Sequence, residues 1–378
     1  MTKGTIFITG ATGFLGSAFL LEALREGYSA HVVARSQSKV ELVKKLVAEH
    51  GFSNDESAGD DTPHCKYFVV PDLTVSGAFD EAVKGAHYVL HCASPLPFAE
   101  IPPERQQAEM IDPAVACTLN ALESARGPGG ATVRRVIILA SLAAFASADA
   151  MGPDWAPPVG EVFEGSERSL NDWILPPFPT VTVCYCAAKT AALRSSLDWM
   201  SKHQQSNLGF DLINLAPAYV IGHHPLAKTT ADLVATSNSV LLRPVAGRAA
   251  DPACGFLTVG GGTHLDDLVT ICMESLKEGE GGKAKTPTEG ADKGVSNFTI
   301  GVNADWNDAK RIVAAKWPAH VESGLLPNGG DFPCKPRIAF DSSKTEKTFG
   351  IKLRGLEDMV DAIMPQYIEL LQKEQGGS

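Results

Sequence analysis

Tyr185 and Lys189 are the two side chains in this sequence whose types and spacing best suit acid–base chemistry. They stand four residues apart in a segment with apolar residues at helical spacing as far as residue 203, so we expect both on one face of a helix. A free tyrosine has a pKa of about 10, and a nearby ammonium group stabilises the phenolate. We therefore expect Lys189 to lower the pKa of Tyr185. Because such pairs also occur by chance, this interpretation depends on the rest of the chain.

A second group of residues could bind a ligand through the backbone, in the run TIFITGATGFLG at residues 5–16. A short β-branched and aromatic run is followed by three glycines and then by a helical pattern over residues 17–26. Glycines let the backbone approach a pyrophosphate, and the N–H groups at the helix start face it. The flanking strand and helix favour dinucleotide binding over an ordinary turn. The residues expected to line this site are Gly10, Thr12, Gly13, Phe14, Leu15 and Gly16.

Arg35 indicates which dinucleotide is bound, because it ends the next predicted strand, residues 30–34. An acidic residue at this place would accept a hydrogen bond from the ribose 2′-OH of NAD, whereas an arginine pairs with the 2′-phosphate of NADP. Ser36 and Lys39 can add to the same phosphate site. The alternative is a solvated charge at a strand end, but the position after this glycine turn favours NADP(H).

Short polar or small residues follow three further predicted strands. In a doubly wound parallel sheet the carboxyl ends of the strands face the ligand, so these residues should lie beside the cofactor and the reacting group. Asp72 could accept a hydrogen bond from the adenine amino group or cap the helix predicted after it, and both interpretations stay open. The residues concerned are Asp72, Leu73, Ala93, Ser94 and Ser141.

Other elements are predicted from local patterns alone. A helix is expected over residues 77–85 and another over residues 112–126, with Asn120 either on its surface or toward the site. Residues 210–221 predict a single strand. Asp266 is expected to cap the helix that begins beside it.

The composition limits the class of protein. With 378 residues, of which 44% are hydrophobic, the chain can form one large α/β domain with a smaller appendage. Its net charge of −11 argues against a nucleic-acid or anionic-membrane surface. We expect no metal site, because the eight cysteines lack ligand spacing, and a cytoplasmic location, because no leader or membrane-length apolar run is evident.

Together these residues resemble the extended branch of the short-chain dehydrogenase/reductase superfamily, the NAD-dependent epimerase/dehydratase family. Within it the chain looks most like the dihydroflavonol reductase and cinnamoyl-CoA reductase group and the related fungal aldehyde–ketone reductases. The resemblance covers nearly the whole chain. It rests on the GATGFLG turn, Arg35, Asp72-Leu73, Ser141, the YxxxK motif at Tyr185 and Lys189, and segments 91–95, 169–173, 214–217 and 341–344.

The resemblance implies a role for each matching residue. Ser141 would hold a carbonyl oxygen, Tyr185 would donate the proton, and Lys189 would bind the nicotinamide ribose. The implied activity is NADPH-dependent reduction of an aldehyde or ketone of a small, secondary-metabolite-like compound. Flavonoid reductases carry an asparagine five residues after the catalytic serine, where this chain has Ala146, so a flavonoid substrate is not expected. The residues implied to flank the nicotinamide carboxamide are Pro217, Ala218 and Val220.

The implied fold is a Rossmann domain with a smaller substrate-binding lobe. We place the NADP-binding domain at residues 1–221 and the lobe at residues 222–378. Residues 256–275 and 295–301 are expected to return to the first domain's sheet, and 277–294 to form a surface insertion. The residues expected to line the substrate pocket are Phe98, Phe145, Trp173, Tyr219 and Leu226.

Two other functions stay open. A sugar-nucleotide epimerase or dehydratase would share the fold, but it usually uses NAD, and Arg35 counts against it. A non-catalytic dinucleotide sensor would not need Ser141, Tyr185 and Lys189, all of which are present. The expected partner is a small carbonyl compound, and the chain could be a monomer or a homodimer.

Overall fold

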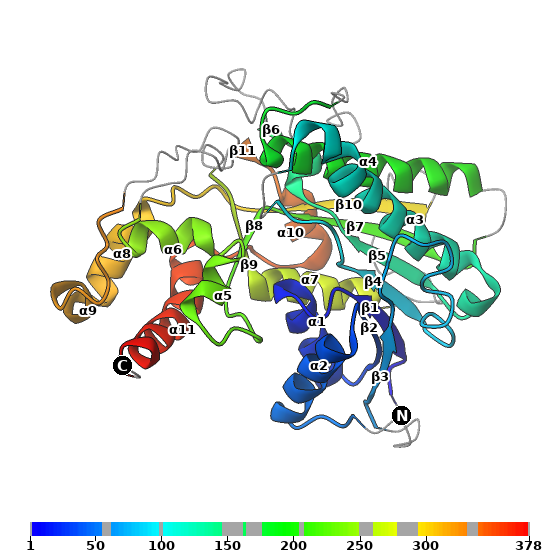
Figure 1. Cartoon of the computed structure of the whole chain (residues 1–378), viewed down its shortest axis with the longest axis horizontal. Coiled ribbons are helices and arrows are strands. Elements are labelled where there is room, and N and C mark those ends of the chain that lie inside the picture. Colours follow the sequence, from blue (N-terminus) through cyan, green and yellow to red (C-terminus); the bar gives the residue numbers. More distant parts are fainter. Residues whose placement is uncertain are drawn as a thin grey trace.

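The computed structural model describes residues 2–54, 62–97, 101–145, 162–163, 176–203, 208–248, 260–277, 294–330 and 339–376. A seven-stranded sheet runs through the larger part of the molecule, in the order β10-β7-β5-β4-β1-β2-β3, and every neighbouring pair is parallel (Figure 1). Its strands are β1 (Thr5–Thr9), β2 (Ser29–Ala34), β3 (Cys65–Val69), β4 (Tyr88–His91), β5 (Arg135–Leu139), β7 (Asp211–Pro217) and β10 (Val295–Ile300). The predicted doubly wound α/β fold is therefore confirmed.

The alternation of side chains along β1 explains the two layers of helices. Ile6 and Ile8 are fully buried on one face of the sheet, in a cluster with residues of α1, α2 and α7. Phe7, also fully buried, points to the opposite face, in a cluster with residues of α3 and α4. A strand that is apolar on both faces thus becomes the centre of a three-layer domain (Figure 1).

Helices cover both faces of the sheet and also build a separate lobe beside it (Figure 1). Among the described residues no helix combines the length and the apolar character needed to cross a membrane. The helices are α1 (Phe14–Arg25), α2 (Gln37–Glu49), α3 (Asp112–Arg126), α4 (Val181–His203), α5 (Thr230–Val234), α6 (Ser239–Val245), α7 (Leu265–Leu276), α8 (Asp308–Lys316), α9 (Pro318–Glu322), α10 (Ser343–Phe349) and α11 (Leu356–Gly376), with a π-helical turn at Gln107–Ile111 and 3₁₀ turns at Pro103–Arg105, Pro128–Gly130 and Leu142–Ala144.

The lobe has its own hydrophobic core. Its core residues come mainly from α5, α6, α8 and α11 and enclose Trp306, whose side chain is 1% exposed. Two short parallel pairs complete the described strands, β8 (Tyr219–Ile221) with β9 (Gly262–His264) and β6 (Val162–Phe163) with β11 (Ala339–Phe340). The division at residue 221 remains a prediction.

The order of the strands places a crevice at the carboxyl ends of β1 and β4. The chain adds β2 and β3 on one side of β1 and then crosses to the other side for β4. Loops that leave β1 and β4 therefore diverge, which opens the space where ligands bind in doubly wound sheets. Thr9 lies opposite both Val33 and His91 in the register, so the ends of three strands meet there.

The helix predicted over residues 77–85 is wrong, because this stretch forms a series of turns. Gly77 and Gly85, at its two ends, have φ of +75° and +76°, which an α-helix does not accommodate. Phe79 is nevertheless fully buried, with its ring centroid 5.4 Å from that of Phe7. The apolar residues that suggested a helix are therefore buried against the rest of the fold without forming one.

The single strand predicted over residues 210–221 is also wrong. β7 ends at Pro217, and the N–H of Ala218 donates to Ile300 O at 2.9 Å and to Thr263 Oγ1 at 3.0 Å. The chain then leaves the large sheet, and β8 pairs with β9. Within the range 256–275 that was expected to return to the first domain's sheet, β9 belongs to the small pair, α7 packs on the large sheet in the cluster with Ile6 and Ile8, and residues 256–259 lie outside the described residues. β10 does join the large sheet, at its edge.

Candidate active site

The glycine turn after β1 is shaped by two close backbone contacts. Gly10 has φ +78°, and a Cβ on it would lie 2.9 Å from Ala93 N. A Cβ on Gly16 would lie 2.2 Å from Gly10 O, so α1 rests directly on the turn. The turn is closed by the N–H of Gly13, which donates to Gly10 O at 3.0 Å. The absence of a side chain at Gly10 and Gly16 therefore lets the turn pack directly against Ala93 and α1.

Gly13 has a different environment. A Cβ there would meet only Gly10 O, at 3.5 Å, so the space above this residue is open. Gly13 is also the N-cap of α1, no side chain in the described part of the chain caps this helix end, and the first turn of α1 carries no acidic residue. An open cradle with uncapped N–H groups and a positive helix end suits a pyrophosphate. Thr12 and Leu15 are half-buried beside it, and Phe14 is buried.

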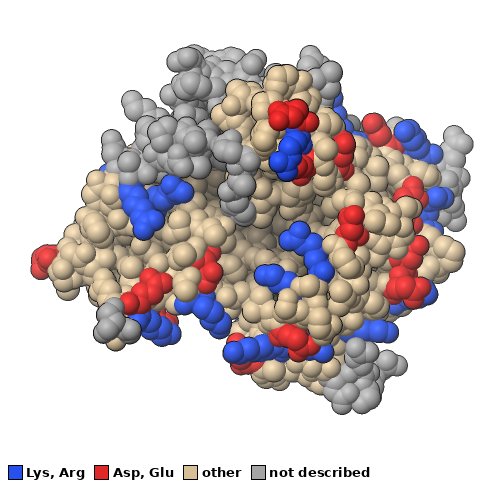
Figure 2. All heavy atoms as spheres, in the orientation of Figure 1, with Lys and Arg blue, Asp and Glu red and all other residues tan. Residues whose placement is uncertain are grey.

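Arg35 and Lys39 form a basic group at the start of α2. Both side chains are exposed, and among the described residues neither has an ion pair or a side-chain hydrogen bond. Ser36 is the N-cap of α2, and its Oγ bonds to Ser38 Oγ at 2.9 Å. Cations at a helix N-terminus are unfavourable unless an anion is bound. Figure 2 shows Lys and Arg side chains beside the hollow at the centre of this face of the molecule.

Asp72 is used within its own turn. Its Oδ1 accepts hydrogen bonds from Thr74 N at 2.8 Å and from Thr74 Oγ1 at 2.6 Å, and these bonds lower the pKa of the carboxyl group. No helix follows it, so the residue stabilises a turn instead of capping a helix. Asn120 Nδ2, on α3, donates to Leu73 O and to Val75 O, both at 2.9 Å. Asn120 therefore fastens this turn, and its side chain does not point to the site.

Ser141 and Tyr185 are brought together by two elements distant in sequence. Ser141 follows β5 and caps the 3₁₀ turn Leu142–Ala144, where its Oγ accepts from Ala143 N at 3.1 Å. Tyr185, in the second turn of α4, has a side-chain hydrogen bond with Ser141. The Ser141 hydroxyl and the Tyr185 phenol are thus direct neighbours, at the carboxyl edge of the sheet.

Lys189 lies one turn further along α4 and is 8% exposed. Its Nζ donates to Leu139 O at 3.5 Å and lies 5.7 Å from the centroid of the Tyr185 ring. Burial lowers the pKa of Lys189 to about 8, an effect that the thiols of Cys92 and Cys117 partly oppose. The structure therefore unites Ser141, Tyr185 and Lys189.

The pKa of Tyr185 is raised, so the net lowering expected from the nearby ammonium group is not seen. Burial raises the pKa of Tyr185, Cys186 adds to this rise, and the hydrogen bond with Ser141 opposes it. The phenol therefore keeps its proton at neutral pH. An acid that stays protonated until a basic oxygen approaches is suited to proton donation.

A small cavity lies beside this group. Its lining includes Ala93, Ser94 and Lys189, so the loop after β4 does reach the Lys189 side chain. His91 also lines it, but burial lowers the pKa of His91 to about 3 and its Nδ1 shares a hydrogen bond with Thr9 Oγ1 at 3.0 Å. The ring is therefore neutral and structural, a role that the sequence did not reveal.

The residues implied to flank a nicotinamide lie where β7 leaves the sheet. Pro217 and Val220 are buried, and Ala218 is half-buried. Thr263 Oγ1 accepts from Ala218 N and itself donates to Ile300 O at 2.5 Å, so it fixes this bend. Sequence patterns gave no signal for Thr263. The cofactor contacts of the three implied residues remain predictions.

The predicted substrate residues fall in different places. Phe98 and Trp173 lie outside the described residues, as does Ala146. Phe145 is 1% exposed and packs in the core with Leu142 and Leu193. The Tyr219 ring is 6.2 Å from the Trp306 ring in an edge-to-face arrangement. The Leu226 N–H donates to His224 Nδ1 at 3.2 Å. Their contacts with a substrate remain predictions.

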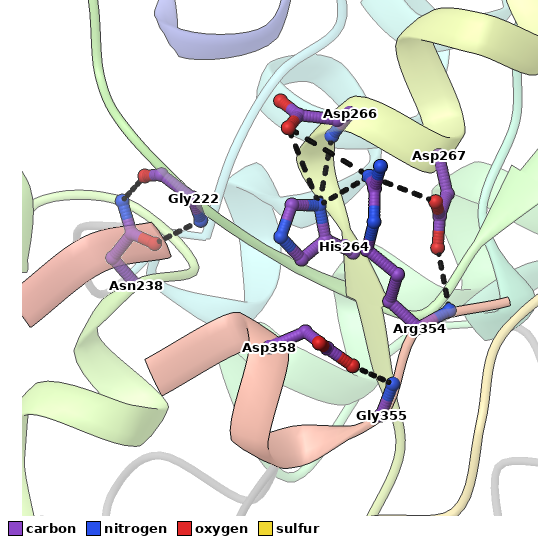
Figure 3. Close-up of polar contacts among 8 residues, drawn as sticks. All are labelled: Gly222, Asn238, His264, Asp266, Asp267, Arg354, Gly355 and Asp358. Carbon is purple, nitrogen blue, oxygen red and sulfur yellow. Dashed lines mark hydrogen bonds and ion pairs between the residues drawn. The ribbon is translucent and has the colours of Figure 1, made fainter. Parts of the chain in front are cut away.

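His264 caps α7 in place of the predicted Asp266. Its Nδ1 accepts from Asp266 N at 3.1 Å, while the Asp266 carboxylate is largely exposed (Figure 3). Arg354 lies against the same ring and pairs with Asp267 at 3.1 Å (Figure 3). This cluster joins α7 to the segment before α11, and burial lowers the pKa of His264. His264 is thus a structural residue.

The model of the "NAD dependent epimerase/dehydratase family" matches residues 6–271. The chain belongs to this family. The predicted family relationship is thereby confirmed. "Ketoreductase CTB6" of Cercospora nicotianae is 32% identical to this chain over 384 residues, which cover 100% of this chain and 98% of that relative. "Dihydroflavonol 4-reductase" of Zea mays is 26% identical over 70% of this chain and 64% of its own length.

A solved structure with a similar fold is "yeast methylglyoxal/isovaleraldehyde reductase Gre2 complexed with NADPH". It aligns with a TM-score of 0.70 at 20% identity and covers 98% of this chain and 99% of its own. At this level of identity the likeness shows the fold.

Proposed function

We propose that the protein is an NADP(H)-dependent reductase that converts an aldehyde or ketone of a small organic compound into an alcohol. The observation that carries this proposal is the hydrogen bond between the Tyr185 phenol and the Ser141 hydroxyl, beside the buried amine of Lys189. The ketoreductase name of the Cercospora relative and the NADPH bound to the yeast reductase support it.

The residues around the glycine turn suit NADP(H). The N–H groups at the start of α1 would hold the pyrophosphate, and Arg35 with Lys39 would pair with the 2′-phosphate. Lys189 would bind the nicotinamide ribose. When bound, the nicotinamide supplies the hydride.

The chain's own residues would then orient and protonate the carbonyl oxygen. The Ser141 hydroxyl would hold that oxygen, and the Tyr185 phenol, protonated because burial raises its pKa, would donate its proton to it. The resulting phenolate would be stabilised by the hydroxyl of Ser141 and by the ammonium of Lys189. Lys189 is buried and Ser141 and Tyr185 are half-buried, and such stabilisation is stronger there than in water.

Tyr185→Phe tests the proposed acid. It should lower turnover of NADPH with a panel of aldehydes and ketones by about 10²–10⁴-fold, because the proton donor is lost, while NADPH still binds. Tyr28→Phe is the matched control, since it makes the same chemical change at a buried tyrosine just before β2, at the amino edge of the sheet. Near-normal turnover by Tyr185→Phe would contradict the proposal.

Stoichiometric release of NADP⁺ separates a reductase from an epimerase or dehydratase that regenerates its cofactor.

Arg35→Ala tests the proposed 2′-phosphate contact. Hydrogen bonds to charged groups contribute about 1.5–3 kcal/mol, so NADPH affinity should fall roughly ten- to hundredfold while NADH affinity stays nearly constant. Arg25→Ala, which removes an exposed arginine paired with Glu22 on α1, should change neither affinity. An unchanged ratio of the two dissociation constants in Arg35→Ala would refute the assignment.

A further inference from the structure

A second cavity, of about 290 Å³, lies in the lobe between α5, α6 and α11. It shares no lining residue with the cavity beside Lys189. Part of its wall is apolar and consists of Ala231, Val234 and Ala246. The rest includes two cationic side chains and one phenol. These are Arg243, Arg248 and Tyr367.

The two arginines are held by one rigid turn. Arg248 N donates to Arg243 O at 3.0 Å, and Gly247 between them has φ +70°. A neighbouring segment fixes this turn from outside, because Asn328 N donates to Val245 O at 2.8 Å. Among the described residues neither guanidinium group has an ion pair or a hydrogen bond, although each carries five N–H donors.

Tyr367 adds a donor that has no partner within the described part of the chain. Its side chain is only 5% exposed, and no hydrogen bond of its hydroxyl is present there. This hydroxyl is not among the fully buried side-chain atoms without a partner, so water in the cavity that Tyr367 lines can reach it. The carboxylate of Glu374 lies at the wall of the same cavity, where it accepts from Thr230 N at 2.7 Å and from Thr230 Oγ1 at 2.9 Å.

We propose that this cavity is a second small-molecule site, which binds a carboxylate carried on an apolar body. A carboxylate accepts hydrogen bonds from guanidinium groups in the planar geometry that arginine favours, and it would also accept from the Tyr367 hydroxyl. The apolar body would lie against Ala231, Val234 and Ala246. The volume is at the lower end of the range for ligand pockets, so it suits a compact aromatic or aliphatic acid.

Calorimetric titration of the full chain with 3-phenylpropanoate and with hexanoate tests the site. We expect saturable binding of one molecule per chain, and binding of the neutral 3-phenylpropanamide at least about tenfold weaker, because the amide lacks the charge. Arg243→Gln and Arg248→Gln should each weaken carboxylate binding about tenfold. Arg311→Gln, an exposed arginine on α8 that does not line the cavity, should leave it unchanged.

Two further variants separate binding from stability. Tyr367→Phe removes a hydroxyl that has no hydrogen bond within the described residues, so the melting temperature should stay nearly constant while carboxylate affinity falls. Val234→Trp should fill the cavity and abolish binding. The proposal is overturned if neither acid binds saturably, if the amide binds equally well, or if the arginine variants bind like the wild type. Binding lost in Arg35→Ala but kept in the two cavity-arginine variants would place the acid at the dinucleotide site, which also overturns it.

Discussion

Alanine at Gly16 should destabilise the folded protein even before any cofactor is added. A Cβ there would lie 2.2 Å from Gly10 O, 2.5 Å from Gly10 C and 2.8 Å from Ala11 N. Favourable contacts between such atoms lie at about 3.5 Å, so α1 would have to move about 1 Å from the turn. All three atoms are backbone atoms, and no side-chain rotation can relieve the clash.

The expected cost follows from two opposing effects. Overpacking of this kind typically costs about 1–3 kcal/mol. Alanine in a helix recovers roughly 0.5–1 kcal/mol relative to glycine. The free energy of unfolding of Gly16→Ala should therefore fall by about 1–2 kcal/mol, and NADPH binding should weaken as well, because the same movement displaces the start of α1.

Gly13→Ala is the matched control three residues away. Gly13 has φ −110° and ψ 177°, which alanine adopts easily, and its Cβ would meet only Gly10 O at 3.5 Å. Its unfolding midpoint should therefore match that of the wild type. The new methyl group would enter the open space above the turn, so NADPH affinity should fall about tenfold or more.

Urea unfolding followed by circular dichroism, without cofactor, measures the first effect, and NADPH titration measures the second. Equal unfolding midpoints for Gly16→Ala and the wild type would refute the packing argument. Wild-type affinity for NADPH in Gly13→Ala would refute the assignment of the open cradle to the pyrophosphate. The two substitutions thus separate a glycine needed for folding from one needed for binding.

Two more predictions concern buried polar groups. Lys189→Met should be more stable than the wild type at pH 7, because burial lowers the pKa of Lys189 from 10.5 in the unfolded chain to about 8. Between these values the unfolded state binds more protons at residue 189, so the contribution of Lys189 to wild-type stability should rise with pH from 8 to 10.5, and the difference in urea midpoint between Lys189→Met and the wild type should shrink across this window. Asn120→Ala removes two hydrogen bonds to the turn at residues 72–75 and should lower the free energy of unfolding by about 1–2 kcal/mol. It should also raise the KM for NADPH more than it lowers kcat, and an unchanged unfolding midpoint would contradict it.

The sequence alone located the elements that carry strong local signals. β1 and α3 have the predicted bounds, Thr5–Thr9 and Asp112–Arg126. The first is an uninterrupted apolar strand that ends at a glycine, and the second is an amphipathic helix with an early proline. Ser141 could be placed at the ligand edge because strand ends in a parallel sheet share one edge, and its place near Tyr185 came from the family resemblance.

Interactions between distant segments explain what the sequence did not reveal. Ala218 turns out of the sheet because Thr263, 45 residues away, binds its N–H. His264 replaces Asp266 as a cap in a cluster with Arg354, which lies 90 residues further along the chain. Neither pairing leaves a local pattern, and a carboxylate is the commoner cap. The rise in the pKa of Tyr185 was missed because its main cause, burial, is a property of the folded chain.

The two pKa shifts at the site have one physical origin and complementary effects. Burial disfavours charge, so it raises the pKa of Tyr185 and lowers that of Lys189, and both changes favour the neutral forms. The pKa of Lys189 is about 8, so the amine is still largely charged at pH 7, whereas the phenol is fully protonated. The site therefore pairs a neutral acid with a cation. When the acid gives up its proton, the negative charge that remains forms beside that cation, which suits reduction of a carbonyl at neutral pH. Above pH 8 Lys189 loses its charge. A Tyr185 phenolate would then lack a neighbouring cation in a buried setting.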